Sequence, residues 1–138
     1  MSVLVDTSIW SLALRRKHSD LSSNGRLLIT ALRDLILEGR AQIVGPIRQE
    51  ILSGIREAER FRMIMNELRD YPEPKLDVSD YEEASRMSNQ CRARGISGSS
   101  TDFLICAIAQ HRRWKIFTTD RDFENYRKAI PVSLYVPS

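Results

Sequence analysis

Four acidic residues, Asp6, Glu50, Asp102 and Asp120, are the residues of this sequence best suited to chemistry. If their carboxylates converge, two of them about 5 Å apart repel by roughly 3 kcal/mol at an effective dielectric near 20. Such a cluster must take up protons or bind cations. The donors are all hard oxygens, with no cysteine nearby and both histidines outside the pattern, so Mg²⁺ or Mn²⁺ is predicted rather than Zn²⁺.

A divalent cation held by carboxylates is suited to one kind of reaction in particular. It lowers the pKa of a bound water and neutralises charge on a leaving oxygen, most effectively in two-ion sites about 3.5–4 Å apart. The sequence contains no phosphate-loop lysine, nucleophile-elbow serine or glycine-rich dinucleotide turn. Metal-assisted hydrolysis of phosphodiester bonds is therefore the reaction that the acids indicate.

The predicted strands would place some of these acids at one edge of a sheet. The apolar run 3–5 predicts a strand buried on both faces, which puts Asp6 at its carboxyl end. Further strands are predicted over 41–44, 114–118 and 132–136, and the third of these is followed by Asp120. In parallel sheets the carboxyl edge is where catalytic sites collect.

Helices are predicted between the strands, which gives an α/β fold with a mainly parallel sheet. Right-handed crossovers then place all the strand-to-helix junctions on one edge of that sheet. The predicted helices cover 9–14, the stretch from the Ser22-Ser23-Asn24 cap to Gly39, the stretch from Gly45-Pro46 onward, 57–68, 78–94 with Ser79 or Asp80 as its cap, 102–109, and a short helix opening at Asp120 or Arg121.

Each acid also has an explanation that involves no chemistry. Asp6, Asp102 and Asp120 are suited to capping a helix or facing its positive end, and Glu50 to a solvated helix face. Taken singly these explanations are the better ones. Taken together they fit less well, because Ser, Thr or Asn would cap equally well, and serines or threonines already flank three of the four positions.

Length and composition predict one domain spanning residues 1–138, with 42% hydrophobic residues. No apolar stretch approaches the roughly 20 residues of a membrane span, and the first is too short for a signal peptide, so a cytoplasmic location is expected. Cys91 and Cys106 form no C-x-x-C pair and are expected to be buried free thiols. A net charge of +3 suits a polyanionic partner.

Four segments carry a family resemblance: Val-Leu-Val-Asp6-Thr-Ser-Ile-Trp, Gln49-Glu50-Ile-Leu-Ser-Gly54, Ser-Thr-Asp102-Phe-Leu-Ile-Cys-Ala-Ile-Ala109 and Phe-Thr-Thr-Asp120-Arg-Asp-Phe123. In order and spacing the chain resembles the PIN-domain ribonucleases, specifically VapC-like toxins of type II toxin–antitoxin pairs, over nearly its whole length. The resemblance implies a three-layer α/β/α fold and a Mg²⁺- or Mn²⁺-dependent endoribonuclease, usually a homodimer, that is kept inactive by a small VapB-like antitoxin.

The resemblance also implies that Asp6, Glu50, Asp102 and Asp120 form an acidic quartet. Asp6 and Asp102 are expected to coordinate the principal ion, and Asp120 to complete the site directly or through water. Glu50 is expected to orient or deprotonate the attacking water. Asp122 competes for the fourth place, although the family's Thr-x-Asp spacing favours Asp120.

Two hydroxyls and a basic cluster complete the candidate site. Ser8 and Thr118 are candidates to hydrogen-bond the acids or a phosphate, with plain cap and strand-end roles as alternatives. RNA phosphates require basic residues, because phosphate contacts dominate nucleic-acid affinity. The RNA-binding candidates are Arg15, Arg16 and Lys17, followed by Arg48 and by Arg92 or Arg94, and a solvated helix end explains each of them as well.

Two other classes of protein compete with this interpretation. A phosphoacceptor domain also places an Asp after its first strand. However, a response-regulator receiver requires an acidic pair before that Asp, and a haloacid-dehalogenase-like phosphatase requires a second Asp two residues after it. Here apolar residues precede Asp6, and position 8 is Ser. The remaining alternative is a non-catalytic module of the same fold that binds RNA or a partner without turnover.

Overall fold

The computed structural model describes residues 1–15 and 21–137 of the chain. Short strands alternate with longer helical stretches, as the predicted α/β fold requires. In chain order the elements are β1 (Val3–Val5), α1 (Thr7–Arg15), α2 (Ser23–Leu37), β2 (Ala41–Gln42), α3 (Gly45–Ser53), α4 (Ala58–Leu68), α5 (Val78–Ala93), α6 (Ser100–Arg112), β3 (Lys115–Phe117) and α7 (Asp122–Tyr126).

The sheet has the strand order β2-β1-β3, and both pairs of neighbours are parallel. The predicted strand over 132–136 is shorter than expected, because only Leu134 forms a bridge, parallel to Ile116 of β3. Pro131 and Pro137 flank this segment, and proline lacks the N–H that would extend the pairing. The sheet is therefore wholly parallel, with β1 at its centre.

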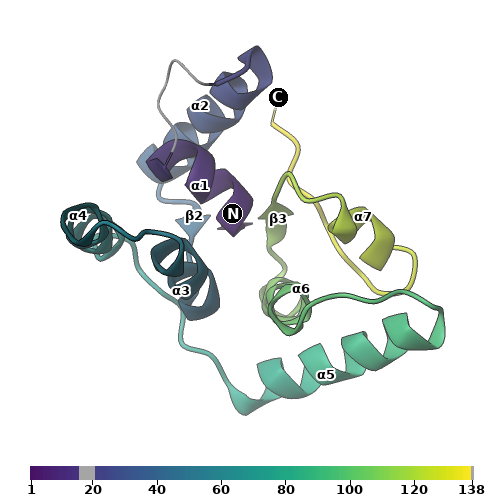
Figure 1. The fold of residues 1–138 in the computed structure, drawn as a ribbon. Helices are drawn as coiled ribbons and strands as arrows, with labels where there is room; N and C mark the ends of the chain where they lie inside the picture. Colours follow the sequence, from purple (N-terminus) through teal and green to yellow (C-terminus); the bar gives the residue numbers. More distant parts are fainter. Residues whose placement is uncertain (16–20, 138) are drawn as a thin grey trace.

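Helices cover both faces of the sheet (Figure 1). The pair α1 and α2 lies on one side, and α6 lies on the other with α5 beyond it. All three residues of β1 are at most 1% exposed, as a central strand with two covered faces must be. This arrangement confirms the predicted α/β fold with a short, parallel central sheet, and it leaves the carboxyl ends of the strands at a single edge.

Local sequence signals set most of the helix ends. Ser22 caps α2, since its Oγ accepts a hydrogen bond from the Gly25 N–H at 3.0 Å, and Gly39 follows that helix with a φ of +70°. Pro46 lies in the first turn of α3. The predicted cap of α5 was wrong, because the N-cap is Asp77 rather than Ser79 or Asp80.

Asp80 is the N3 residue of a capping box with Asp77, and its carboxylate also takes part in a buried ion-pair cluster that joins α5 to the end of α6. Its side chain is 1% exposed and accepts hydrogen bonds from Arg112 at 2.9 and 3.0 Å and from the Asp77 N–H at 2.9 Å, with His111 Nδ1 at 2.8 Å. The Arg112 guanidinium holds the pKa of Asp80 well below its usual range, against the effect of burial. The cluster anchors the carboxyl-terminal end of α6, the helix that carries Asp102 at its other end.

Two further expectations from the sequence concerned membrane spans and the two cysteines. No helix within residues 1–15 and 21–137 is both long enough and apolar enough to cross a membrane. Cys91 and Cys106 are free and buried, which confirms the prediction for both. Burial raises the pKa of each thiol, which lowers the fraction of thiolate at neutral pH.

Replacing Asp80 tests the ion-pair cluster. Asp80→Ala is expected to lower the free energy of unfolding by about 3 kcal/mol, because Arg112 loses its counter-charge in a buried position. Since the pKa of Asp80 is lowered on folding, this stabilisation is present above a pH of about 4 and is lost as the pH falls below it. Urea unfolding of the two proteins should therefore differ at pH 7 and converge in acid.

The matched control is Glu82→Ala, which removes an exposed carboxylate from the same helix. Its free energy of unfolding should stay within about 0.5 kcal/mol of wild type. Equal losses in the two variants would contradict the anchoring role of Asp80.

Candidate metal centre

Asp6 lies directly after the central strand and is only 6% exposed. Its backbone N–H donates to the Phe117 carbonyl at 2.9 Å, which fixes it beside the end of β3. Its own carbonyl accepts from the N–H of Trp10 and so begins the hydrogen bonding of α1. The backbone of Asp6 therefore occupies the capping position, while its carboxylate is engaged elsewhere.

Two hydroxyls hold the Asp6 carboxylate. Thr118 Oγ1 donates to Asp6 Oδ2 at 2.7 Å, and Ser8 Oγ donates to the same oxygen at 3.1 Å. Each hydroxyl accepts in turn from a backbone N–H after β3, with Thr119 donating to Ser8 at 3.1 Å and Asp120 donating to Thr118 at 3.0 Å. A backbone amide that donates to a hydroxyl polarises that hydroxyl and strengthens the hydrogen bond that the hydroxyl itself donates. Ser8 and Thr118 thus join β1 to β3 through Asp6.

Asp102 lies in the first turn of α6 but is not its cap. The cap is Ser99, whose Oγ accepts from the Asp102 N–H at 3.1 Å. The Asp102 carboxylate accepts a hydrogen bond from the Tyr126 hydroxyl at 2.7 Å. Burial, together with the negative charges of Asp6 and Asp120, raises the pKa of Asp102 despite the Tyr126 bond.

Asp102, Asp120 and Asp122 each place a carboxylate oxygen within 4.8 Å of the other two. The Asp122 N–H, in the first turn of α7, donates to Asp120 Oδ1 at 2.9 Å, so the two acids are held together by their own loop. Like charges this close repel one another, although water screens the exposed Asp120 and Asp122. In an octahedral Mg²⁺ site with bonds of about 2.1 Å, ligand oxygens lie about 3 Å apart when cis and about 4.2 Å apart when trans, so these three hard donors would share such an ion after their carboxylates moved closer together.

The structure therefore brings Asp102 and Asp120 together, as the sequence suggested, and adds Asp122 as an equal neighbour. Asp6 is outside this trio, yet its charge contributes to the raised pKa of Asp102. The choice between Asp120 and Asp122 as the fourth acid stays a prediction, because both carboxylates reach Asp102.

Glu50 approaches the same edge from α3 and is exposed. Thr7 Oγ1 donates to Glu50 Oε1 at 3.1 Å. Partial burial raises the pKa of Glu50, as do the charges of Asp6 and Asp102, while the Thr7 bond opposes them. The carboxylate opens onto a cleft of about 390 Å³ that is lined by Thr7, Pro46, Gln49, Glu50, Ser53 and Thr101.

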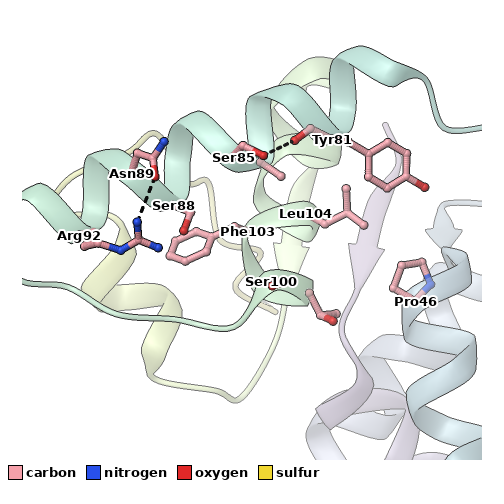
Figure 2. A pocket seen from close by; sticks show the side chains of 11 residues that line it. Pro46, Tyr81, Ser85, Ser88, Asn89, Arg92, Ser100, Phe103 and Leu104 are labelled. Atoms are coloured by element: carbon pink, nitrogen blue, oxygen red, sulfur yellow. Dashed lines mark hydrogen bonds between the residues drawn. The ribbon is translucent and has the colours of Figure 1, made fainter.

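A second cavity of about 490 Å³ lies between α5 and α6 and shares Pro46 and Thr101 with the first. In Figure 2 the side chains of α5 face those of α6 across it, with Pro46 of α3 at one end. It is lined by Pro46, Tyr81, Ala84, Ser85, Ser88, Asn89, Arg92, Ser100, Thr101, Phe103 and Leu104.

The basic RNA-binding candidates are only partly within the described residues. Arg16 and Lys17 lie outside them, as does the side chain of Arg15, although the backbone of Arg15 ends α1. Arg48 is paired with Glu73 at 2.9 Å. Of the remaining two, Arg94 donates to a carbonyl of the Lys128 backbone, and Arg92 donates to Asn89 and lines the second cavity.

Sequence reasoning missed Tyr126 and Thr7 as residues that hydrogen-bond the acids of this site. The spacing of Phe123 and Tyr126 on α7 indicates a buried helix face, and nothing in that spacing predicts which acid a buried hydroxyl reaches. The contact with Asp102 depends on how α7 packs against α6.

A parallel sheet with carboxylates collected at its carboxyl edge is the arrangement that the resemblance to PIN-domain ribonucleases implies. The family model described as PIN domain matches residues 3–129, so the chain belongs to the PIN-domain family. This membership confirms the resemblance and sets aside the receiver and phosphatase alternatives. A search of curated protein sequences found no significant match.

Solved structures share this fold at low sequence identity. FitAcB from Neisseria gonorrhoeae is 18% identical with a TM-score of 0.74, covering 98% of this chain and 97% of that one. A toxin–antitoxin complex from Klebsiella pneumoniae is 18% identical with a TM-score of 0.73, covering 99% and 98%. VapBC-1 from nontypeable Haemophilus influenzae is 11% identical with a TM-score of 0.73, covering 98% and 97%.

Removing one charge from the cluster tests its electrostatics. Because the pKa of Asp102 is raised on folding, its ionisation costs stability as the pH rises through the carboxyl's ordinary range. Asp102→Asn removes that cost and is expected to raise the Tm of metal-free protein at pH 7 by roughly 2–5 °C. The difference should shrink at about pH 3, below the ordinary pKa of an aspartate, because the wild-type carboxyl is then protonated in both the folded and the unfolded state, and differential scanning calorimetry measures both values.

Asp34→Asn, at an exposed position on α2, is the control and should leave the Tm unchanged at both pH values. A clear fall in the Tm of Asp102→Asn at pH 7 would instead favour a structural role for this carboxylate.

Proposed function

We propose that this chain is a VapC-like toxin, an endoribonuclease that depends on Mg²⁺ or Mn²⁺ and hydrolyses RNA phosphodiester bonds. The observation that carries the proposal is the convergence of Asp102, Asp120 and Asp122 within 4.8 Å at the carboxyl edge of the sheet. Membership of the PIN-domain family supports it. The cleft beside Glu50 offers space for a substrate at the same edge.

The carboxylates would hold the ion, with Asp6 and Asp102 as ligands and Asp120 or Asp122 completing the set. The ion would lower the pKa of a bound water and neutralise charge on the leaving oxygen. Asp6 is suited to this task because Ser8 and Thr118 fix its carboxylate while adding no positive charge. Its position is set before an ion arrives.

Glu50 is placed to handle the proton of the attacking water. A base needs a pKa closer to neutral than that of an ordinary carboxylate, and partial burial with two neighbouring acids shifts Glu50 in that direction. The Thr7 hydroxyl holds one of its oxygens and leaves the other available. Glu50 would accept the proton as the water attacks phosphorus.

The proposed partners are an RNA substrate, a VapB-like antitoxin and a second copy of this chain in a homodimer, and the proposed location is the cytoplasm. Support for an antitoxin comes from the similar structure from Klebsiella, which is of a toxin–antitoxin complex, and from VapBC-1 of Haemophilus. The net charge of +3 suits RNA as a polyanion.

Asp6→Asn tests the proposed metal ligand. Purified protein, freed of antitoxin, is expected to cleave single-stranded or loop RNA only when Mg²⁺ or Mn²⁺ is present, and EDTA should abolish cleavage. Asp6→Asn should lower kcat/KM by at least about 100-fold, because a lost ligand weakens charge stabilisation worth several kcal/mol. The measurement is gel-based cleavage of a defined RNA over a metal titration.

Asp70→Asn is the control, since it removes an exposed acid just after α4 and should cleave as wild type does. Wild-type rates in Asp6→Asn would contradict the ligand assignment. If wild-type protein bound RNA with no cleavage at any metal concentration, the non-catalytic alternative would replace the proposal.

Glu50→Gln tests whether Glu50 acts as a proton acceptor or as a metal ligand. The substitution keeps the hydrogen-bond acceptor for Thr7 but removes the proton acceptor, so kcat is expected to fall about 100-fold while Mn²⁺ affinity changes by less than about threefold. Single-turnover cleavage and isothermal calorimetry with Mn²⁺ measure the two quantities. A matching loss of Mn²⁺ affinity would make Glu50 a ligand instead of a base.

A further inference from the structure

Tyr126 contributes a hydroxyl to the acidic edge from the last helix of the chain. Its hydroxyl donates to Asp102 Oδ2 at 2.7 Å, and its side chain is completely buried. The bond therefore links α7 to the first turn of α6. Asp122, at the start of α7, lies in the same trio as Asp102, so one short helix supplies both an acid and a hydrogen-bond donor to this edge.

The ring of Tyr126 is fixed by two aromatic neighbours. Its centroid lies 5.0 Å from that of Phe103 and 5.4 Å from that of Phe123, in tilted and edge-on arrangements. Aromatic pairs in these arrangements stabilise each other beyond the area that they bury. The hydroxyl consequently reaches Asp102 from a ring that has little freedom to move.

Gly98 leaves the room that this hydroxyl needs. A Cβ at position 98 would lie 2.5 Å from the Tyr126 hydroxyl oxygen and 2.7 and 2.8 Å from two carbons of its ring. These separations are far below van der Waals contact. Any side chain at position 98 must therefore push the ring of Tyr126 away from its place beside Asp102.

We propose that Tyr126 is a positioning residue, which together with the space left by Gly98 orients the Asp102 carboxylate for a divalent cation. This inference rests on the proposed function, because it assumes that Asp102 is a metal ligand. The hydroxyl occupies one lone pair of Oδ2 and restricts the rotation of the carboxylate, while the other oxygen accepts no bond from Tyr126. Residues that hydrogen-bond a metal ligand typically affect metal affinity by about 10–100-fold.

A neutral donor suits this position better than a cation would. Lys or Arg at the same place would cancel part of the charge that attracts the ion, whereas a hydroxyl orients the carboxylate and leaves its charge intact. The same type of donor holds Asp6 through Ser8 and Thr118, and Glu50 through Thr7. Tyr126 provides the same kind of neutral donor for Asp102.

The test is the affinity for Mn²⁺ in the absence of RNA, measured by electron paramagnetic resonance or calorimetry on the full chain. Tyr126→Phe keeps the ring and its two aromatic contacts and removes only the hydroxyl. Its dissociation constant for Mn²⁺ is expected to rise about tenfold or more. Gly98→Ala should raise it as well, because the displaced ring loses the same bond.

Tyr71→Phe is the matched control. The Tyr71 ring packs against Trp10 at a centroid distance of 5.1 Å, and the acids that influence it are Glu67 and Asp70. This variant should bind Mn²⁺ as wild type does. In RNA cleavage, Tyr126→Phe should need more Mn²⁺ for half-maximal rate yet approach the wild-type rate at saturation, with KM for RNA unchanged.

The outcomes separate the inference from the proposed function. If wild type binds Mn²⁺ and Tyr126→Phe binds it equally well, the positioning role is wrong and the proposed nuclease stands. If wild type binds no Mn²⁺, or if Asp102→Asn binds it as wild type does, the proposed metal site fails and the positioning role fails with it. Should Gly98→Ala not fold, Tyr126→Phe alone decides, with its fold checked by circular dichroism.

Discussion

Mutual repulsion of carboxylates at one edge of the sheet is the constraint on which the candidate site depends. Asp102, Asp120 and Asp122 lie close enough for their negative charges to repel one another. The fold keeps such acids in place with neutral donors, since hydroxyls bind Asp6, Glu50 and Asp102. A hydroxyl stabilises the position of a carboxylate without cancelling the charge that attracts a cation. Burial raises the pKa values of Glu50 and Asp102, and the neighbouring negative charges add to that effect.

The opposite end of α6 shows the contrasting solution. Asp6 and Asp80 are the buried charged side chains of the described part, and they are treated differently. Asp80 is paired with Arg112 and His111, and its pKa is lowered. These ion pairs hold α5 to α6. Among the described residues, the side chains that donate to the Asp6 carboxylate are the hydroxyls of Ser8 and Thr118. The difference between cationic and neutral partners distinguishes an acid that serves the fold from one that is available to a ligand.

Much of the fold followed from local pattern. The apolar run of β1, the Ser22 cap and Gly39 around α2, and Pro46 at the start of α3 each acted as their chemistry suggests. The incorrect predictions arose where contacts with a second helix or strand determined the local structure. The last predicted strand shrank to a bridge at Leu134 between two prolines, and Asp80 was taken for a cap because its partners lie about 30 residues later in the chain. The fold is shared with structures no more than 18% identical, so pattern rather than residue identity carries it.

By itself the sequence determined which acids follow strands or open helices, because apolar runs and caps are local signals. It therefore placed Asp6 and Asp120 at one edge and identified Asp102 and Glu50 as their companions. Only the tertiary structure decided how the acids are held. That Asp122 joins Asp102 and Asp120 within 4.8 Å, and that Tyr126 donates to Asp102 across the space left by Gly98, depends on the packing of α7 against α6. Contacts of this kind are set by distances of a few ångströms between elements, which no spacing along the chain encodes.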